Sequence, residues 1–593
     1  MTDGAIRSIQ AIDMGSRKNR LIRMLSYFRP FVGLVALAGL MAVIVNVAEL
    51  VSPYIMKIAI DDYIMGDNAD MGIGTIAVLY FASVAVGSVS NYAHTILLNT
   101  IVQKIIHAIR MELFSHIQRM PMSFFDRHSS GRILTRVTND VEALNEMYAG
   151  VLVALFRDVL LLIGITVAMF SLSVKLAIVS FSVVPVIVLV TFFFKPIAVA
   201  NYRRVRALIA QINGFLAENL SGMRIVQIFN RQKEKYREFR ELNDKYNEAS
   251  LIDVKLMGFF RPSAELINNL GISILIWYCA PSVLQSTLEV GMLYAFITYI
   301  KKFFWPINDL ADKVNVMLSG MVSADRIFEI LDTNEGIEDL DLGSPISDVQ
   351  GRIEFRNVWF AYKGEDWVLK DVSFTIEPGQ TVAFVGATGS GKTTIINLIG
   401  RFYEIQKGQI LLDGVDIREY KLRDLRSRIA VVMQDVFLFS GDIVSNIRLD
   451  NESITDEDAI RAAQYVNAHQ FIEELPNRYN EEVHERGSRL STGQKQLLSF
   501  ARAIAFNPSI LVLDEATANI DTETEKVIQE SLAKISKNRT TLIIAHRLST
   551  IKNADKIIVI HKGRIREIGR HDELLAKKGI YHDLYQMQYA WAQ

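Results

Sequence analysis

Cysteine and net charge are the two features that this 593-residue chain has least of. Its single cysteine, Cys279, excludes an intrachain disulfide and any zinc site built on cysteine. The 64 Lys and Arg residues nearly equal the 65 Asp and Glu residues, so a net charge of −1 gives no overall field that attracts nucleic acid. Hydrophobic residues make up 50% of the chain and charged residues 22%, which excludes a disordered protein and predicts a membrane part joined to a soluble part.

Charged residues are also missing from long runs, and all of these runs lie in the first half of the chain. A bilayer core about 30 Å thick needs about 20 apolar residues in a helix. We therefore expect six membrane spans, the last two with amphipathic ends, in residues 31–48, 71–103, 159–174, 176–194, 266–288 and 290–300. The alternative is six buried helices of a large soluble protein, but uncharged runs of this length are rare outside lipid.

The connections between these runs differ in their basic residues. Residues 58–71 contain four aspartates and no Lys or Arg, whereas the segments after the second and fourth runs are rich in arginine, with Arg110, Arg127, Arg204 and Arg231 among them. Excess Lys and Arg mark the cytoplasmic side of a membrane. The pattern predicts a multi-pass protein of the cytoplasmic membrane with both termini in the cytoplasm.

The two basic segments are long enough to form helical hairpins outside the membrane. Each has about 50 to 60 residues, so a helix out and a helix back would reach about 35 to 40 Å. Their tips would lie at residues 124–131 and 221–230, where short polar turns suit docking of a cytoplasmic partner. Simple cytoplasmic loops are the alternative.

The second half of the chain carries a phosphate-binding loop. An apolar strand at residues 381–385 is followed by Gly-Ala-Thr-Gly-Ser-Gly-Lys-Thr and then by a helical pattern. Glycines let backbone N–H groups approach a phosphate closely, and the helix N-terminus adds partial positive charge. We expect Lys392 to reach the β- and γ-phosphates of a nucleotide and Thr393 to bind Mg²⁺. The expected nucleotide-binding residues here are Gly386, Gly389, Ser390, Gly391, Lys392, Thr393 and Thr394.

Further candidate catalytic residues follow two later apolar strands. Asp514 and Glu515 end the strand at residues 510–513, where Asp514 would hold Mg²⁺ and Glu515 would orient or deprotonate the attacking water. Asp-Glu after an apolar run is by itself an ordinary helix start. His546 follows the strand at residues 541–545 and would contact the γ-phosphate, although a lone histidine is usually structural.

Together these motifs resemble the nucleotide-binding domain of an ABC transporter, and the chain from about residue 20 onward resembles an ABC exporter half-transporter. The family's Leu-Ser-Gly-Gly-Gln signature stands here as Leu-Ser-Thr-Gly-Gln at residues 490–494. The resemblance implies that Tyr362 stacks on adenine, that Gln434 takes part in catalysis and Mg²⁺ binding, and that Asp521 belongs to the D-loop. It also implies that Glu485 contacts the intracellular loops.

The expected fold is an all-α polytopic membrane domain with six transmembrane helices, followed by an α/β P-loop NTPase domain. We divide the chain into an N-terminal cytoplasmic segment with an elbow helix (1–30), a transmembrane domain with two long intracellular loops (31–320), a linker (321–350) and an ABC nucleotide-binding domain (351–593).

The resemblance further implies a head-to-tail dimer in which Ser491, Gly493 and Gln494 of one chain act on ATP held by the partner. Thr492 replaces a signature glycine, while Lys392, Gln434, Asp514, Glu515 and His546 are all present. This combination resembles the subunit of heterodimeric multidrug exporters that carries the catalytic glutamate, with one hydrolysing and one degenerate ATP site. A tolerated substitution in a homodimer is the alternative.

We therefore expect this protein to export a hydrophobic or amphipathic small molecule, drug-like or lipid-like, in a reaction that requires ATP and Mg²⁺. We also expect it to contact membrane lipid and to bind no nucleic acid. Aromatic and Met residues of the last two spans are candidates to line an adaptable apolar cavity, although contact with lipid or packing in the core is the more common role for any one of them: Tyr278, Met292, Tyr294, Phe296 and Tyr299. A homodimeric lipid or peptide exporter is the main alternative, and an ATP-gated channel or regulator is a further one.

Overall fold

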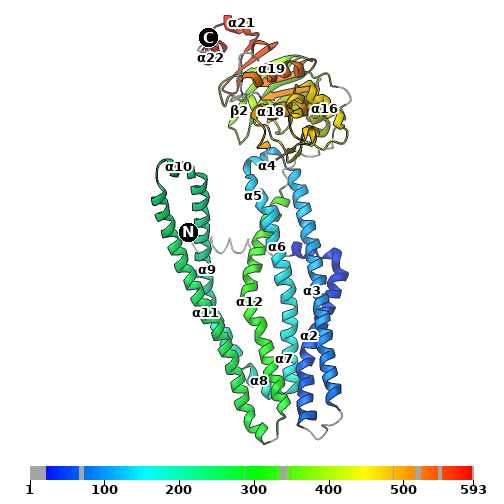
Figure 1. Ribbon diagram of the computed structural model, residues 1–593, viewed down its shortest axis with the longest axis vertical. Coiled ribbons are helices and arrows are strands. Elements are labelled where there is room, and N and C mark those ends of the chain that lie inside the picture. Colours follow the sequence, from blue (N-terminus) through cyan, green and yellow to red (C-terminus); the bar gives the residue numbers. More distant parts are fainter. Residues whose placement is uncertain are drawn as a thin grey trace. The chain divides into compact units, whose positions relative to one another are not determined.

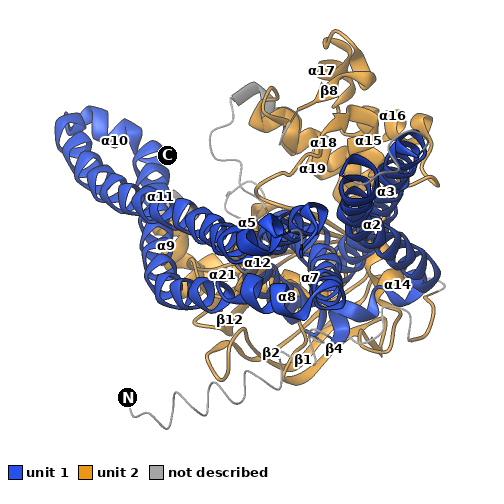
Figure 2. Cartoon of the chain, turned by 90° about the horizontal axis from the view of Figure 1, so that it is seen from below, with its two compact units in different colours: residues 1–118, 131–333 blue, residues 119–130, 334–593 orange. Residues whose placement is uncertain are grey.

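The computed structural model describes residues 22–65, 72–285, 287–333, 343–346, 349–484, 487–514, 522–544 and 551–589. These residues form two compact units (Figure 2), the first from residues 1–118 and 131–333 and the second from residues 119–130 and 334–593. The first unit is built from helices, whereas the second combines helices with β-sheets. The predicted fold class, a helical domain followed by an α/β domain, is confirmed.

Long helices dominate the first unit. The 46 residues of α3 span about 70 Å at 1.5 Å per residue, which is more than twice the thickness of a bilayer core and agrees with the predicted helical extensions. Short helices and π-helical turns connect the long ones. The helices are α2 (Val32–Ile58), α3 (Ile73–Gln118), α5 (Ser130–Thr135), α6 (Val141–Met147), α7 (Val153–Leu172), α8 (Val174–Phe181), α9 (Val184–Ser221), α10 (Met223–Ile228), α11 (Gln232–Leu284) and α12 (Val290–Leu331).

Four helical stretches of the described residues are long and apolar enough to cross a membrane: Ile22–Ile64, Ile73–Gln118, Val174–Ser221 and Gln232–Leu284. The remaining predicted spans fall largely on α7 and α12, and a total of six stays a prediction. Helices α9 and α11 run side by side and are joined by α10 (Figure 1). They form the second of the two expected hairpins.

Two charged side chains of the first unit bond to neighbouring helices. The carboxylate of Asp158 on α7 is buried and lies 2.6 Å from the Lys313 ammonium of α12. The Lys302 ammonium donates a hydrogen bond of 2.7 Å to the Glu49 carbonyl oxygen, which joins α12 to α2. Because an unpaired charge costs free energy in lipid, these contacts favour one arrangement of the helices.

The second unit is organised around a six-stranded sheet with the order β12-β11-β3-β10-β9-β6. All neighbouring pairs in it are parallel except β11 and β12. A second sheet is antiparallel, with the order β2-β1-β4-β5, and β7 pairs with β8. The strands are β1 (Ile353–Ala361), β2 (Trp367–Ile376), β3 (Thr381–Val385), β4 (Lys407–Leu412), β5 (Val415–Asp416), β6 (Ile429–Val432), β7 (Gly441–Asp442), β8 (Glu482–Val483), β9 (Ile510–Asp514), β10 (Thr540–Ile544), β11 (Lys556–His561) and β12 (Arg564–Gly569).

Strand β3 alternates its side chains between two hydrophobic cores. Ala383 and Val385 join one core with residues of α18, while Val382 and Phe384 join the other with residues of α13. A strand buried on both faces reads as a continuous apolar run, as the sequence shows here. The helices of this unit are α4 (Met122–Arg127), α13 (Lys392–Ile399), α14 (Leu422–Ser427), α15 (Ile443–Arg448), α16 (Asp456–Tyr465), α17 (His469–Glu473), α18 (Thr492–Ala505), α19 (Thr522–Ser536), α21 (His571–Ala576) and α22 (Ile580–Tyr589).

Candidate nucleotide-binding site

The register of the parallel strands brings the predicted nucleotide residues to one edge of the sheet. Ile544 of β10 lies opposite both Phe384 of β3 and Asp514 of β9. Val432, the last residue of β6, lies opposite Leu513. Because the strands are parallel, the phosphate loop after β3, Asp514 at the end of β9 and Gln434 after β6 all lie at the carboxyl edge, where open α/β sheets bind ligands.

Glycines give the phosphate loop its shape. Gly389 and Gly391 have φ values of 78° and 107°, which residues with a Cβ rarely adopt. At Gly386 an added Cβ would lie 2.2 Å from the Ile560 carbonyl oxygen, so only glycine fits between the loop and β11. The loop leads directly into α13, whose N-terminal N–H groups carry partial positive charge.

Lys392 is held inside this loop. Its ammonium donates hydrogen bonds to the carbonyl oxygens of Gly386 at 2.7 Å and Ala387 at 3.1 Å, and 7% of the residue is exposed. Burial lowers the pKa of Lys392 below its ordinary value, while the negative charge of Asp514 opposes that shift. A buried cation surrounded by neutral carbonyl groups is a strong site for an anion.

Ser390 gives a direct test of whether the loop suits a phosphate. Its Oγ atom is buried and has no hydrogen-bond partner among the described residues. A buried hydroxyl without a partner is costly, and a phosphate oxygen bound in the loop would accept its proton. Thr393 is exposed at the start of α13, so its hydroxyl is accessible. The loop therefore fits a nucleotide phosphate.

Tyr362, predicted to stack on adenine, follows β1 and lies beside the phosphate loop. Its hydroxyl is hydrogen-bonded to the Thr394 hydroxyl at 3.1 Å, yet 44% of the residue is exposed. The ring packs edge-on against Phe360, with ring centres 4.8 Å apart. An exposed aromatic ring held on a rigid strand end is suited to stacking on a base.

The signature residues form the start of α18. Ser491 is its N-cap: the Ser491 hydroxyl accepts the Gln494 N–H at 3.2 Å, and the Gln494 side chain accepts the Ser491 N–H at 2.9 Å. Gly493 is buried, whereas Ser491 and Thr492 are exposed. Part of the signature string is thus explained by a capping box.

Several predicted residues lie outside the described residues. They are the catalytic candidates Glu515 and His546, the D-loop residue Asp521 and Glu485. Gln434 is described and exposed, two residues beyond the end of β6. Within the described residues no cluster of three or more His, Cys, Asp or Glu side chains forms a metal site.

Two contacts near the site were not predicted from the sequence. Tyr403 donates a hydrogen bond of 2.6 Å to the carboxylate of Asp126 on α4, and its ring lies edge-on to Tyr362. The Arg502 guanidinium on α18 donates to the Phe437 and Asn446 carbonyl oxygens at 3.1 and 2.9 Å. No motif signals these pairs, because the partners are far apart in sequence.

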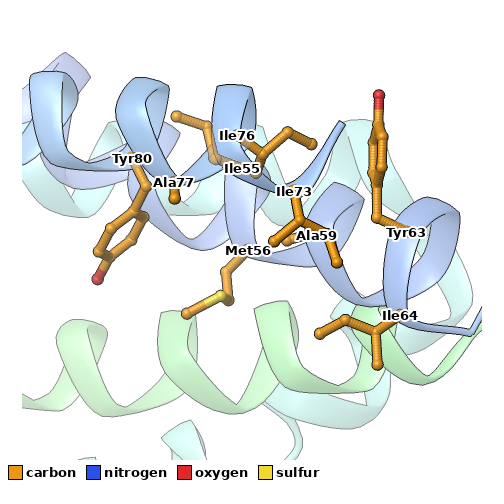
Figure 3. Close-up of a pocket in the computed structure, with 9 residues that line it drawn as sticks. All are labelled: Ile55, Met56, Ala59, Tyr63, Ile64, Ile73, Ile76, Ala77 and Tyr80. Atoms are coloured by element: carbon orange, nitrogen blue, oxygen red, sulfur yellow. The ribbon is translucent and has the colours of Figure 1, made fainter. Parts of the chain in front are cut away.

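The expected cavity residues separate into two groups. Phe296 and Tyr299 are buried in the helical core, and the Tyr299 hydroxyl donates to the Leu50 carbonyl oxygen at 2.7 Å. Tyr278 and Tyr294 are 47% and 40% exposed, while Met292 is partly buried against the core. A different cavity of about 240 Å³ (Figure 3) is lined by Ile55, Met56, Ala59, Tyr63, Ile64, Ile73, Ile76, Ala77 and Tyr80.

Comparisons with known proteins agree with this geometry. Residues 35–307 match the family described as ABC transporter transmembrane region, and residues 369–518 match the family described as ABC transporter. The chain is 42% identical over 502 residues to the probable multidrug resistance ABC transporter ATP-binding/permease protein YheH of Bacillus subtilis (strain 168), covering 84% of this chain and 74% of that protein. It is 35% identical over 569 residues to an ATP-dependent lipid A-core flippase of Syntrophus aciditrophicus (strain SB), covering 96% and 94%.

A solved structure of a bacterial Atm1-family ABC exporter with ATP bound matches with a TM-score of 0.78 at 27% identity, covering 95% of this chain and 98% of that chain. The chain therefore belongs to the ABC transporter family. It is an ABC exporter half-transporter, a multi-pass membrane protein whose transmembrane domain is fused to an ATP-binding domain, and its ATPase activity is coupled to transport. ABC exporters of this kind work as dimers.

Proposed function

We propose that this chain exports a hydrophobic or amphipathic small molecule across the cytoplasmic membrane as one half of a heterodimer with one hydrolysing and one degenerate ATP site. The observation that carries the nucleotide assignment is the loop itself, where the Lys392 ammonium is buried and the buried Ser390 hydroxyl has no hydrogen-bond partner within the described ranges. Backbone N–H groups of Gly386, Gly389 and Gly391 complete the phosphate site, and Tyr362 stacks on the adenine.

The hydrolytic residues are assigned by strand position and family resemblance. Glu515 follows Asp514 at the carboxyl end of β9 and orients the attacking water, and His546 follows β10 and stabilises charge on the γ-phosphate. Gln434 and Asp521 complete the surroundings of the reacting phosphate. The result is an in-line attack that depends on positioning and electrostatics rather than on a covalent intermediate.

The side chains proposed to hold Mg²⁺ are Thr393, Gln434 and Asp514. The fit rests on their oxygen donors and on the pairing of β6 with β9, because Asp514 ends β9 and Gln434 follows the neighbouring β6. Bound Mg²⁺ would neutralise charge on the nucleotide phosphates.

The heterodimer proposal rests on Thr492. It is the first residue of α18 and is exposed, so its side chain adds bulk to the surface of the signature helix and not to a core of its own chain. Ser491, Gly493 and Gln494 would face the partner's ATP, and Thr492 would weaken hydrolysis there. A homodimer remains the alternative, and it requires both composite sites to be competent.

The substrate class is supported by two observations. The relatives' names refer to multidrug resistance and to a lipid A-core flippase. In this chain, the accessible aromatic residues of α11 and α12, Tyr278 and Tyr294, are suited to apolar groups.

The proposal also includes the domain boundaries at residues 30, 320 and 350. Both termini and the ATP-binding domain are proposed to lie in the cytoplasm.

Purification in native-like membrane discs tests the subunit composition. Expression of the tagged chain together with the half-transporters of its source is expected to give a 1:1 complex with a second protein. Its ATPase activity should be stimulated by substrate, and about one of the two ATP sites in each complex should hydrolyse ATP. A stable dimer of this chain alone with full activity from two sites would contradict the heterodimer.

A further inference from the structure

Tyr403 connects the proposed adenine site to the tip of the first intracellular loop. It lies four residues after the end of α13, the helix that begins with Lys392. Its ring contacts that of Tyr362 edge-on, with centres 5.1 Å apart. On the other side its hydroxyl donates to the Asp126 carboxylate at 2.6 Å. One side chain therefore touches both the base-stacking tyrosine and α4.

The adenine end of this connection is hydrogen-bonded to the phosphate-loop helix and to the segment after Tyr403. The Tyr362 hydroxyl is bonded to Thr394 of the phosphate-loop helix, so the ring has little freedom to move independently of that helix. The Gln406 side chain accepts the Ala361 N–H at 3.0 Å and donates to the Ala361 carbonyl at 2.9 Å. This pair fixes the chain just before Tyr362 to the segment just after Tyr403.

The other end is a short helix with a firm anchor. Phe124 of α4 is 1% exposed, and its ring stacks on that of His128 at 4.4 Å. Asp126 is exposed apart from its bond to Tyr403. Burial raises the pKa of Tyr403, and the Asp126 carboxylate raises it further, so the hydroxyl remains a proton donor at neutral pH. The bond is charge-assisted and therefore stronger than one between neutral groups.

We propose that Tyr403 is a positioning residue that links occupancy of the adenine site to α4: a base stacked on Tyr362 fixes the Tyr362 and Tyr403 rings and strengthens the hydrogen bond to Asp126. The inference rests on the proposed adenine role of Tyr362. Because such coupling is reciprocal, loss of the Tyr403–Asp126 bond must weaken binding of a nucleotide that carries a base. Binding of triphosphate without a base should be unaffected.

The test uses the full-length complex without Mg²⁺, so that no hydrolysis occurs, and compares Tyr403→Phe, Asp126→Asn and the double variant. ATP affinity is measured directly, and inorganic triphosphate is measured by competition against a fluorescent ATP analogue whose own affinity is determined for each variant. We expect each variant, including the double one, to weaken ATP binding by the same factor of about threefold to tenfold. Triphosphate affinity should stay within about twofold of the wild-type value.

Two control variants separate the possible failures. Tyr420→Phe removes another tyrosine hydroxyl of this unit, which donates to the Leu412 carbonyl oxygen at 3.2 Å, and should leave both affinities unchanged. Tyr362→Ala should weaken ATP binding, and unchanged affinity there would overturn the adenine assignment itself. If Tyr362→Ala weakens ATP binding while Tyr403→Phe and Asp126→Asn do not, the link is wrong. Equal weakening of triphosphate, or additive losses in the double variant, would also overturn it.

Discussion

At the scale of single residues, the nucleotide site depends on polar groups that are buried before any ligand binds. The Lys392 ammonium is held by two loop carbonyls, and the Ser390 hydroxyl has no partner in the described part of the chain. Such groups are costly to bury, so the free energy they gain from a phosphate is correspondingly large.

Replacement of the loop lysine tests this directly. Lys392→Met removes the buried cation while keeping a chain of similar length, and we expect ATP affinity to fall at least about tenfold because a charge-assisted contact is lost. Lys537→Met, a change at an exposed lysine, is the control and should bind ATP normally. Equilibrium nucleotide binding is the measurement, and wild-type affinity in Lys392→Met would refute the phosphate role.

A second residue-scale prediction concerns the stability of the antiparallel sheet at low pH. Burial alone would raise the pKa of Asp416, but hydrogen bonds from the Arg418 side chain and N–H lower it below its ordinary 3.8. Its contribution to stability is therefore complete above about pH 5 and is lost as the pH falls through the lowered value. Asp416→Asn should reduce the free energy of unfolding by about 1 to 2 kcal/mol at pH 7.

Thermal unfolding of wild type and Asp416→Asn between pH 3 and pH 8 measures this effect. The difference between the two proteins should shrink toward the acidic end, because Asp416 becomes protonated there. A difference that grows as the pH falls would have the wrong sign for a carboxylate with a lowered pKa.

Sequence reasoning found the phosphate loop because its chemistry requires a fixed local string, GATGSGKT, between a strand and a helix. It did not find Tyr403, whose partner Asp126 is 277 positions away. It also gave Gln494 only a role in ATP binding. Ser-x-x-Gln is a recognisable capping box, and Ser491 and Gln494 form one at the start of α18. Local chemistry is visible in a sequence, whereas contacts made by folding are not.

At the scale of secondary-structure elements, α18 combines a stability role with the proposed role toward the partner's ATP. Its N-cap Ser491 and that of α16, Thr455, have equivalent capping boxes.

Long apolar runs in the sequence predicted α3 well, because the thickness of the bilayer and the rise per residue of a helix set the length that a span requires. The π-helical turns at Ala59–Ile64 and Tyr148–Leu152 were not foreseen, because hydropathy does not report a local change in helical winding.

The two caps give a matched pair of variants. Ser491→Ala and Thr455→Ala should each cost about 1 kcal/mol, and so lower the melting temperature by about 2 to 4 °C. Only Ser491→Ala should also weaken ATP binding at the degenerate site, because only Ser491 is proposed to contact the ATP held by the partner. Thermal unfolding and equilibrium ATP binding to the complex supply the two readouts; ATP affinity that falls equally in both variants would assign Ser491 a structural role alone.

At the scale of the whole molecule, the account requires that the two ends of the helical unit face opposite sides of the membrane. Thr287 lies between α11 and α12, and Ile228 ends α10, where it is 65% exposed. The predicted orientation places the first outside the cell and the second in the cytoplasm.

Single cysteines test this orientation in a Cys279→Ser background. Thr287→Cys should react with a membrane-impermeant maleimide on intact cells, whereas Ile228→Cys should react only after the membrane is permeabilised. The reverse pattern of labelling would mean that the topology is inverted. Labelling of both Thr287→Cys and Ile228→Cys on intact cells would place both positions outside the cell and contradict a membrane crossing between them.

The central claim is that ATP hydrolysis in the second unit drives transport by the first, and transport by the purified complex in proteoliposomes tests it most directly. With ATP outside the vesicles, the account predicts that the wild-type complex accumulates a fluorescent hydrophobic or amphipathic small molecule inside them. Glu515→Gln should retain ATP binding but lose both hydrolysis and accumulation, because the residue that orients the water is neutralised. Accumulation at the wild-type rate in Glu515→Gln would contradict the account.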